Sequence, residues 1–372
     1  MREKTRSIKE EVLSRAGEIV TSVVRASLNS KKAEANAKAI REKYRGLPID
    51  VLADILIKWA ARKTKWEGAA SGLGVTGCEA VVAVPAPEPS HKVAAGTGVV
   101  ALLLGDIAYT TRIQIQLLLA IADLYGCPFD PDDEEDVWVV FKAALGLKGT
   151  ERVGSYGRFI FTETARKQFR KVLRTGIRRA IQNRVVRIAG PRIGRYLGEK
   201  YVMRLVPFVN AAIGYAFNNK VTKSIGRWAK VKSKVRSTTF KQVMQIQEHE
   251  PEALVWVLPT IFYVGTADDK LTENVLTLYS QTNRRLPLDD QQVQRVESLI
   301  DDVELPRILA EKLLRIRTEK ARNALYDIAL TTAAVNFDPQ KEHEECLAEL
   351  AQYLKVNFKV SDLREKVSYF QR

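Results

Sequence analysis

Apolar residues recur at every third or fourth position over most of the chain, which is the spacing of one face of an α-helix. Strict alternation of apolar and polar residues, the pattern of a half-buried strand, is almost absent. Proline and glycine separate the periodic segments, as at Leu47-Pro48 and Gly126-Cys127-Pro128. We therefore predict an all-α protein. The predicted helices cover residues 8–23, 49–61, 106–125, 158–189, 252–265, 292–316 and 319–334.

The composition is that of a globular protein with more than one domain. The chain has 372 residues, of which 46% are hydrophobic and 28% are charged. At about 100 to 200 residues per domain, this length predicts two or three domains. The sign of the charge changes near residues 236–250, where KVKSKVRSTT is followed by an acidic, proline-initiated segment. We therefore expect a multi-helix domain at 1–240 and a small helical domain at 241–372, with a weaker seam at 66–92.

Positive charge is concentrated in one block of the chain. The formal net charge is +15, yet residues 151–240 hold 22 basic and 3 acidic side chains, which gives this block alone a net charge of +19. The flanking blocks are acidic, with 4 basic and 11 acidic side chains in 66–150 and 17 and 22 in 241–372. Such asymmetry indicates a surface that meets an anionic partner, either lipid or nucleic acid; the alternative is a set of solvated basic helices.

Several classes of protein find no support in the sequence. The longest uncharged runs, 205–219 and 254–267, have 15 and 14 residues, fewer than the roughly 20 that a membrane-spanning helix needs. Three cysteines and three histidines, all far apart, argue against a disulfide framework or a zinc cluster. P-loop, H-E-x-x-H and G-x-S-x-G motifs are missing. We expect a cytoplasmic protein, and whether 93–104 and 205–219 enter lipid or pack in a core stays open.

Two motif-like strings have simpler explanations than ligand binding. Gly72-Leu-Gly74-Val-Thr-Gly77 matches a dinucleotide-binding fingerprint, but it lacks the preceding strand and the acid about 20 residues further on. The glycines suit close helix packing or a turn. The acidic run at 130–136 lacks the glycine and the glutamate of a calcium loop, so we interpret it as the start of a helix, where carboxylates oppose the helix dipole.

The basic block contains an amphipathic helix and a glycine-spaced segment. In 158–189, apolar residues follow helical spacing while cations cover the other sides. Gly190, Gly194 and Gly198 then share one helical face, and with Gly214 they predict close helix packing. Trp228, among basic residues, is an interfacial anchor on one interpretation and core packing on the other. The predicted anion- or lipid-binding residues are Arg166, Lys167, Arg170, Lys171, Arg174, Arg178, Arg179, Arg192, Arg195, Lys223, Arg227 and Trp228.

Two segments of this region resemble the EcsC family. LLLGDIAYTTRIQIQLLLAIADLYG (102–126) resembles the centre of that family, with an acid after an apolar run and a helix that ends in YG. LVPFVNAAIGYAFNNKVTKSIGRWA (205–229) resembles its later P-x-x-G-x-x-I-G and N-x-x-x-T-x-x-I-G-x-x-A segments, with Asn210 where the family often has glycine. The resemblance covers about 45–235. It implies a bacterial, cytoplasmic or membrane-associated helical protein, and it brings no catalytic residues.

The C-terminal part resembles a TerB-like helical domain, from the tellurite-resistance family. The two similar segments are 262–289 and 327–356, in which A-D-G elements open helices. Asp268 stands at the first acid, with Asp269 in place of glycine, and Asn336-Phe337 replaces the second D-G. The resemblance implies a metal site formed by these acids, with Ca²⁺ or Mg²⁺ as the metal, because both ions prefer oxygen ligands. No other cofactor is predicted. The candidate ligands are Asp268, Asp269, Glu273, Asp338 and Glu342.

Three functions follow from these features, and we favour the first. It is a non-enzymatic adaptor that is peripheral to the inner face of the plasma membrane. This adaptor docks on anionic lipid or an integral membrane partner through the basic region, and it recruits a protein through the acidic C-terminal domain. The alternative is a nucleic-acid-binding protein that uses the same block, although aromatic residues for base stacking are sparse there. A lipid-directed enzyme is the third, with a polar pocket lined by Asp106, Arg112 and Asp123.

Overall fold

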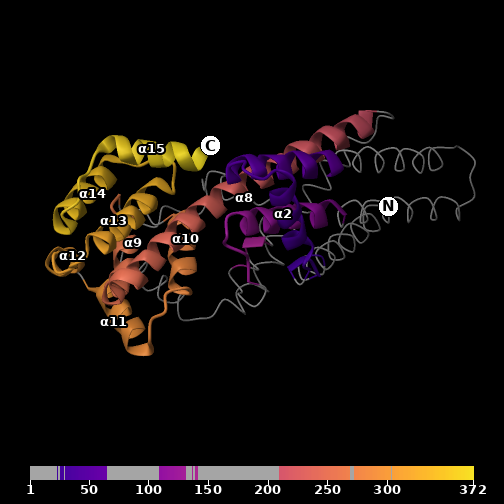
Figure 1. Ribbon diagram of the computed structural model, residues 1–372. Helices are drawn as coiled ribbons and strands as arrows, with labels where there is room; N and C mark the ends of the chain where they lie inside the picture. Colours follow the sequence, from indigo (N-terminus) through magenta and orange to yellow (C-terminus); the bar gives the residue numbers. More distant parts are fainter. Residues whose placement is uncertain are drawn as a thin grey trace, which may run out of the picture. The chain divides into compact units, whose positions relative to one another are not determined.

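The described part of the protein is helical throughout, as predicted. The structure is a computed structural model, and it describes residues 23, 26–28, 30–64, 109–130, 136, 139–140, 209–268, 272–302 and 304–372 (Figure 1). For residues 209–218, 273, 297 and 301 only the backbone is described. Within these ranges there is no strand, so the all-α prediction is confirmed. The helix predicted at 158–189, and all of that predicted at 8–23 except its last residue, lie outside the described residues.

The chain divides into two compact units. Among the described residues, the first unit holds those up to Lys230 and the second those from Val231 onward. The division falls within one continuous helix, α8 (Val209–His249), which contributes its first part to one unit and its second part to the other. This helix ends at His249, before Pro251, because proline lacks the N–H that a helix interior requires. The boundary expected from the charge pattern, residue 240, lies within the same helix.

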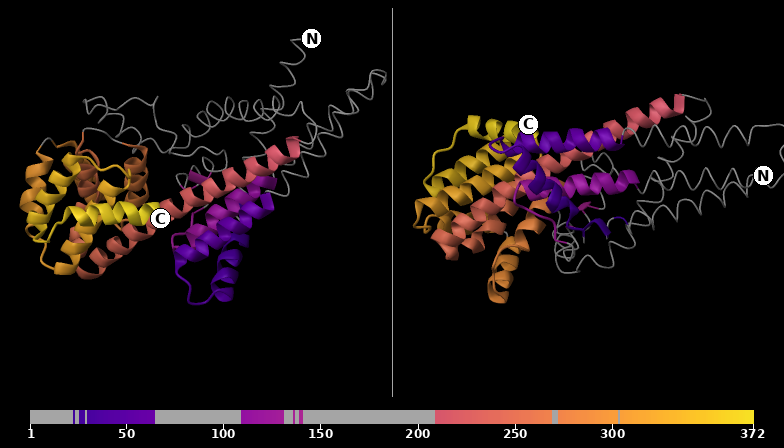
Figure 2. Two further views of the ribbon diagram at one scale, coloured as in Figure 1. Left: turned by 90° about the horizontal axis from the view of Figure 1, so that it is seen from above. Right: turned by 45° about the vertical axis from the view of Figure 1, so that its right-hand side comes forward.

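The first unit packs α8 against a helical hairpin and a third segment. The hairpin consists of α2 (Lys32–Lys43) and the helix 49–64, and the third segment is the helix 109–124 (Figure 2). The helix predicted at 49–61 is confirmed and extends to residue 64. The helix 109–124 ends at Gly126, which has a φ of +70° and donates its N–H to the carbonyl of Asp123, while Cys127 donates to Ala122. This glycine-terminated end matches the prediction from Gly126-Cys127-Pro128.

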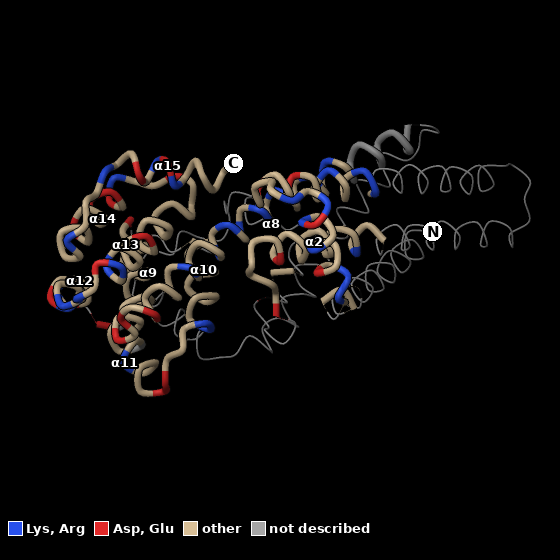
Figure 3. The backbone as a smooth tube through the Cα atoms, in the orientation of Figure 1, with Lys and Arg blue, Asp and Glu red and all other residues tan. Residues whose placement is uncertain are grey.

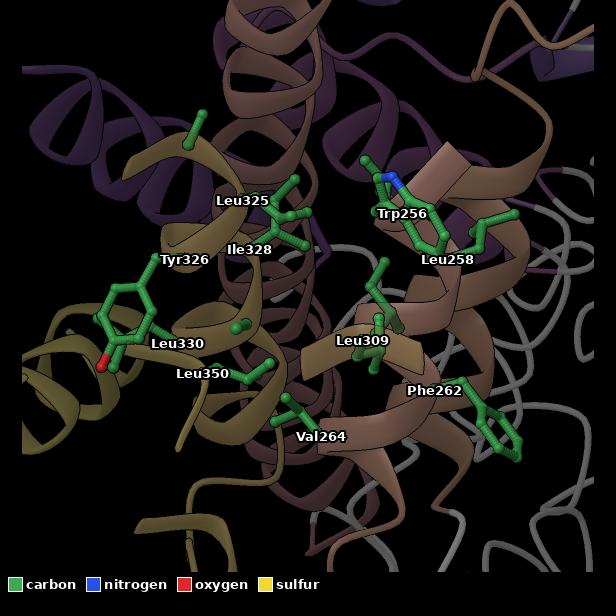
Figure 4. Close-up of a cluster of buried hydrophobic side chains, with 14 of the residues drawn as sticks. Trp256, Leu258, Phe262, Val264, Leu309, Leu325, Tyr326, Ile328, Leu330 and Leu350 are labelled. Carbon is green, nitrogen blue, oxygen red and sulfur yellow. The ribbon is translucent and has the colours of Figure 1, made fainter. Parts of the chain in front are cut away.

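The second unit is built around one buried helix. A 3₁₀ turn, η1 (Pro251–Trp256), leads into α9 (Val257–Gly265), in which every residue but Tyr263 is buried. Helix α9 contacts η1 and all of α10 to α14. Its residues Leu258, Phe262 and Val264 are among the buried apolar side chains labelled in Figure 4. The surrounding helices are α10 (Glu273–Asn283), α11 (Asp290–Asp301), α12 (Leu305–Leu313), α13 (Glu319–Ala334), α14 (Lys341–Leu354) and α15 (Val360–Gln371).

Two of the predicted helices in this unit have different bounds. The segment 292–316, predicted as one helix, is two, because the chain leaves the helical conformation at Asp302 and α12 begins with a proline in its first turn. The segment 252–265 is a 3₁₀ turn followed by α9 rather than one helix. By contrast, the helix predicted at 319–334 is confirmed to the residue by α13.

Glu250 holds the start of α13 to the end of α8. Its carboxylate accepts hydrogen bonds from the backbone N–H of Arg317 at 3.0 Å and of Thr318 at 2.9 Å, and from the Thr318 hydroxyl at 3.0 Å. Burial alone would raise the pKa of Glu250, but the hydrogen bonds from Thr318 and Arg317 outweigh it and lower the pKa below its usual value. The ionised form is therefore the one that the fold stabilises.

Replacing Glu250 with glutamine is expected to lower the free energy of unfolding by about 1 to 2 kcal/mol at pH 7, because the amide supports fewer of these charge-assisted bonds. A carboxylate with a lowered pKa stabilises the fold above its unfolded pKa, and the contribution disappears as the pH falls through the folded value. Urea unfolding at pH 7 and pH 3 measures both effects. Glu248→Gln, at an exposed position of α8, is the control, and an equal loss in both variants would contradict the capping role.

Candidate functional site

Helix α8 presents two different faces to its surroundings in the first unit. Its inward face is formed by residues at positions i, i+3, i+4 and i+7, which lie on one side of a helix. Three of them are almost completely buried: Thr222 is 0% exposed, Ile225 is 1% exposed and Ala229 is 2% exposed, and the fourth, Gly226, is also buried. This face determines how α8 is held by the other helices of the unit.

A buried group of three polar side chains joins three helices. The Thr222 hydroxyl lies 2.9 Å from the hydroxyl of Thr64 and accepts a hydrogen bond from the Gln114 amide at 3.1 Å. These residues come from α8, the helix 49–64 and the helix 109–124, and all three are buried. Because each unmade hydrogen bond in such a position costs about 1 to 3 kcal/mol, the group favours one relative placement of the three helices.

Gly226 allows α8 to approach the same two helices closely. A Cβ atom at this position would lie 2.5 Å from Cγ1 of Ile57 and 3.1 Å from Cδ2 of Leu117. The first distance is far below van der Waals contact, so any side chain here must displace Ile57. The absence of a side chain at residue 226 is thus a packing requirement.

The outward face of α8 in the first unit carries a row of cations. Lys220, Lys223 and Arg227 are spaced by three and four residues, so they lie on one side of the helix over about 10 Å of its length. Lys220 and Arg227 are exposed and Lys223 is half-buried. None of the three makes an ion pair or hydrogen bond within the described residues. We call Lys220, Lys223 and Arg227 the cationic row; Figure 3 shows the basic residues along α8 in blue.

Other cations of the basic block are used inside the fold. Lys230 is 5% exposed and its ammonium lies 2.9 Å from the carboxylate of Asp54. Lys234 is 1% exposed, donates to the carbonyl oxygen of Tyr369 at 3.0 Å and lies 4.6 Å from the centre of that ring. Arg236 is 4% exposed. The expectation that the cations of this block gather on an exposed surface is therefore wrong for these three residues, which are buried.

The inward face of α8 matches the spacing by which the segment resembles a known family. Thr222, Ile225, Gly226 and Ala229 are the T-x-x-I-G-x-x-A positions, and all four face the other helices of the unit. Residues 91–237 match the EcsC protein family. The matched range begins before the helix 109–124 and ends within α8. Searches of curated proteins and of solved structures each give no significant match.

Most of the residues predicted to bind anions lie outside the described residues. Asp106 and three of the predicted packing glycines also lie outside them. Gly214 lies in α8, where only the backbone is described. Lys223 and Arg227 belong to the cationic row. Trp228 is half-buried, and its indole N–H is buried without a hydrogen-bond partner in the described part of the chain. The predicted residues that the structure does not describe are Arg166, Lys167, Arg170, Lys171, Arg174, Arg178, Arg179, Gly190, Arg192, Gly194, Arg195 and Gly198.

The two described residues of the predicted polar pocket do not come together. Arg112 is exposed, and it precedes Asp123 by 11 residues on the same helix, which corresponds to about 16 Å. Asp123 instead lies near α2, where Arg41 donates hydrogen bonds to the carbonyl oxygens of Asp123 and Leu124, both at 2.8 Å. Burial, followed by the charge of Glu34, raises the pKa of Asp123 to about 6, and Arg41 opposes this. Sequence reasoning missed Arg41 because it lies 82 residues away.

The candidate metal ligands of the C-terminal part do not form a described metal site. Among the residues that the structure describes, no group of three or more acidic, histidine or cysteine side chains is placed to hold a metal ion. The two segments that would supply ligands do meet, but through neutral groups, because the Thr272 hydroxyl donates to the Asn336 side chain at 2.6 Å. Asp338 is exposed. The side chains of Asp269 and Glu273 lie outside the description. No family model supports the TerB-like resemblance of this part.

No described helix combines the length and the apolar character that crossing a membrane requires. Helix α8 is long enough, with 41 residues, but eight lysines and arginines are distributed along it.

Proposed function

We propose that the protein is a non-enzymatic adaptor that docks on an anionic membrane surface through the cationic side of its EcsC domain and recruits other proteins through its acidic C-terminal part. The cationic row carries this proposal. Its three cations share one helical face and have no partner in the described part of the chain, whereas Lys230, three residues further, is paired with Asp54. Unpaired cations on a fixed face are suited to anionic headgroups, whose attraction is worth about 1 kcal/mol per Lys or Arg.

The inward face of α8 supports the same proposal. The Thr222 hydrogen bonds and the close approach at Gly226 fix the rotation of α8 about its axis in the first unit. Because these contacts hold the helix, the cationic row keeps its outward orientation although no described residue pairs with it. The row also belongs to the block with 22 basic and 3 acidic residues, which adds long-range attraction to the same kind of surface.

We also propose that residues 241–372 are a TerB-like domain that binds protein partners. Asn336-Phe337 stands where the resemblance places a D-G pair, and Phe337 has a φ of +63°, the left-handed conformation that glycine adopts without strain. The hydrogen bond from Thr272 to Asn336 brings the two similar segments side by side. These neutral groups support a structural loop pair rather than a metal site, so the role proposed for this domain is recruitment.

The proposal is tested by flotation of the full chain with vesicles. Vesicles of phosphatidylcholine with about 30% phosphatidylserine are compared with pure phosphatidylcholine over a salt series. We expect binding only to the anionic vesicles, with affinity that falls as salt rises. Changing Lys220, Lys223 and Arg227 together to glutamate is expected to weaken this binding by about 100-fold, because three contacts of about 1 kcal/mol are lost.

The matched control reverses the same number of charges elsewhere. Lys320, Lys359 and Arg364 are exposed residues of the second unit, and their change to glutamate alters the net charge equally. We expect this control to bind vesicles like the unchanged chain. Duplex DNA, tested over the same salt series, provides the competing outcome. Binding to DNA but not to anionic vesicles would replace the adaptor proposal by nucleic-acid binding.

A further inference from the structure

The turn between α2 and the helix 49–64 exposes a cluster of apolar side chains. Leu47 is 43% exposed, and Ile49 and Val51 are each 41% exposed. Eight large hydrophobic side chains are exposed in the described part of the chain, and four of them, these three and Trp59, belong to this hairpin. We call Leu47, Ile49 and Val51 the apolar tip. Exposed apolar residues gathered at one place mark a contact with lipid or protein more often than scattered ones do.

Hydrogen bonds and backbone conformation hold the apolar tip in place. Gly46 has a φ of +86°, a conformation that turns the chain at the end of α2. Leu47 donates its N–H to the carbonyl of Tyr44, and Pro48 accepts from Val51 and Leu52 to begin the next helix. The exposed side chains therefore project from an ordered turn, which reduces the entropy that binding would cost.

The exposure of the apolar tip is not required by the core of the hairpin. In the helix 49–64, the buried residues lie on one face, and they include Leu52, Leu56 and Ala60. Val51 lies on the opposite side of that helix, on the same face as Lys58 and Arg62. Val51 is therefore not part of the buried face of this helix.

Two cations lie next to the apolar tip in the sequence, and an aromatic ring lies further along the hairpin. Lys43 and Arg45 flank the turn and are exposed, and the Lys43 ammonium lies 5.5 Å from the centre of the Tyr44 ring and 5.6 Å from that of Trp59. Trp59, 40% exposed, follows Ile49 by ten residues, or about 15 Å along the helix. Amphipathic aromatic rings beside lysine are typical of the level of lipid headgroups.

The acidic residues of the hairpin are mostly engaged elsewhere. Residues 41–63 contain six basic and three acidic side chains. Of the three acids, Asp50 accepts a hydrogen bond from the Tyr125 hydroxyl and Asp54 pairs with Lys230. Glu42, the third, is exposed on α2 near the turn. The hairpin therefore carries a net positive charge, with Lys43 and Arg45 next to the apolar tip in the sequence, which complements an anionic bilayer in both charge and polarity.

We propose that the apolar tip inserts into the boundary between headgroups and acyl chains of an anionic bilayer. Leu47, Ile49 and Val51 enter by about 5 to 10 Å, while Lys43, Arg45 and Trp59 remain among the headgroups. This inference rests on the membrane docking proposed above, but it uses different residues. The cationic row attracts the surface and the apolar tip inserts into it.

The test separates insertion from attraction. Vesicle flotation measures binding, and the maximal surface pressure at which the protein still enters a phosphatidylserine-containing monolayer measures insertion. Changing Leu47, Ile49 and Val51 together to serine is expected to lower the insertion pressure and to weaken binding to the phosphatidylserine vesicles by about tenfold or more, with the salt dependence retained. Changing Leu47 and Val51 to phenylalanine is expected to raise the insertion pressure.

Matched controls exclude a general effect of surface hydrophobicity. Met244 and Leu314 are exposed at other places, and their change to serine should leave insertion unchanged. An unaltered thermal unfolding midpoint confirms that the serine variant is folded. The phenylalanine variant tests the same inference through the expected rise in insertion pressure. The variant with glutamate at residues 220, 223 and 227 should bind more weakly but keep its insertion pressure once bound.

Each outcome has a definite meaning for the two proposals. Normal insertion by both tip variants would overturn the insertion inference and leave surface docking standing. Failure of the unchanged chain to bind anionic vesicles would overturn the docking proposal and the inference with it. If the serine variant changes only the oligomeric state in analytical ultracentrifugation, the occupant of the apolar tip is a second copy of the chain, and lipid insertion is contradicted.

Discussion

A valine in place of Gly226 is expected to lower the free energy of unfolding of the first unit by about 3 kcal/mol or more. Even the Cβ atom would lie 2.5 Å from Cγ1 of Ile57, and the two methyl groups of valine add volume where α8 meets two other helices. Alanine at this position should cost less, about 1 to 2 kcal/mol, because its better helix propensity offsets part of the clash.

Urea unfolding followed by circular dichroism measures these losses. Ser224→Val is the control, since it adds a β-branched side chain two residues away on a half-buried part of the same helix. A double-mutant cycle sharpens the test. Ile57→Ala removes the atom nearest to the added Cβ, so Gly226→Ala should cost little in that background. If Gly226→Ala lowers the free energy of unfolding equally with Ile57 and with alanine at residue 57, the close approach of Gly226 to Ile57 is contradicted.

Replacing Asp123 with asparagine is expected to stabilise the first unit by about 2 kcal/mol at pH 7, a figure already reduced for partial exposure to solvent. Burial, followed by the charge of Glu34, raises the pKa of Asp123 to about 6, above its usual value. The folded protein therefore binds this proton more tightly than the unfolded chain. The contribution of Asp123 to stability falls as the pH rises from about 4 to about 6 and is most unfavourable above that range. A carboxylate in the last turn of a helix also faces an unfavourable dipole.

The pH dependence distinguishes the effect of removing the charge of Asp123 from a gain in stability that is the same at every pH. Asparagine carries no charge, so its advantage should be present at about pH 7 and largely absent at about pH 4, as measured by urea unfolding at unit intervals. Glu42→Gln, an exposed carboxylate of the same unit, should change stability by less than about 0.5 kcal/mol at either pH. A destabilised Asp123→Asn variant at neutral pH would show that the ionised carboxylate is stabilising.

Local sequence patterns predicted those parts of the fold that depend on local interactions. The periodicity at 319–334 predicted α13 to the residue, and Gly126-Cys127-Pro128 predicted the end of the helix 109–124. The split of 292–316 into α11 and α12 was missed because apolar spacing continues across the break, although the proline at residue 306 was a usable signal. The two helices 106–125 and 49–61 were likewise found from spacing alone, as far as they are described.

The candidate site was predictable only in part, because its contacts join distant residues. Lys223 and Arg227 were singled out from the basic block, and helical spacing puts them on one face. The sequence could not indicate that Lys230 and Lys234 are buried, since their partners lie 176 and 135 residues away. The apolar tip was missed for the opposite reason. Its residues follow the pattern of a helix start at Leu47-Pro48, and only packing reveals that they are left exposed.

The inward orientation of Thr222, Ile225, Gly226 and Ala229 has a consequence for comparing this chain with others of similar sequence. These residues specify a junction of three helices, and a chain that shares them inherits the junction. Lys223 and Arg227, which lie between them, belong to the outward cationic row, so the charge at these two places can change without altering the junction. The docking proposal therefore predicts that chains with the same three-helix junction differ in their binding to anionic vesicles according to their charges at the places of Lys220, Lys223 and Arg227.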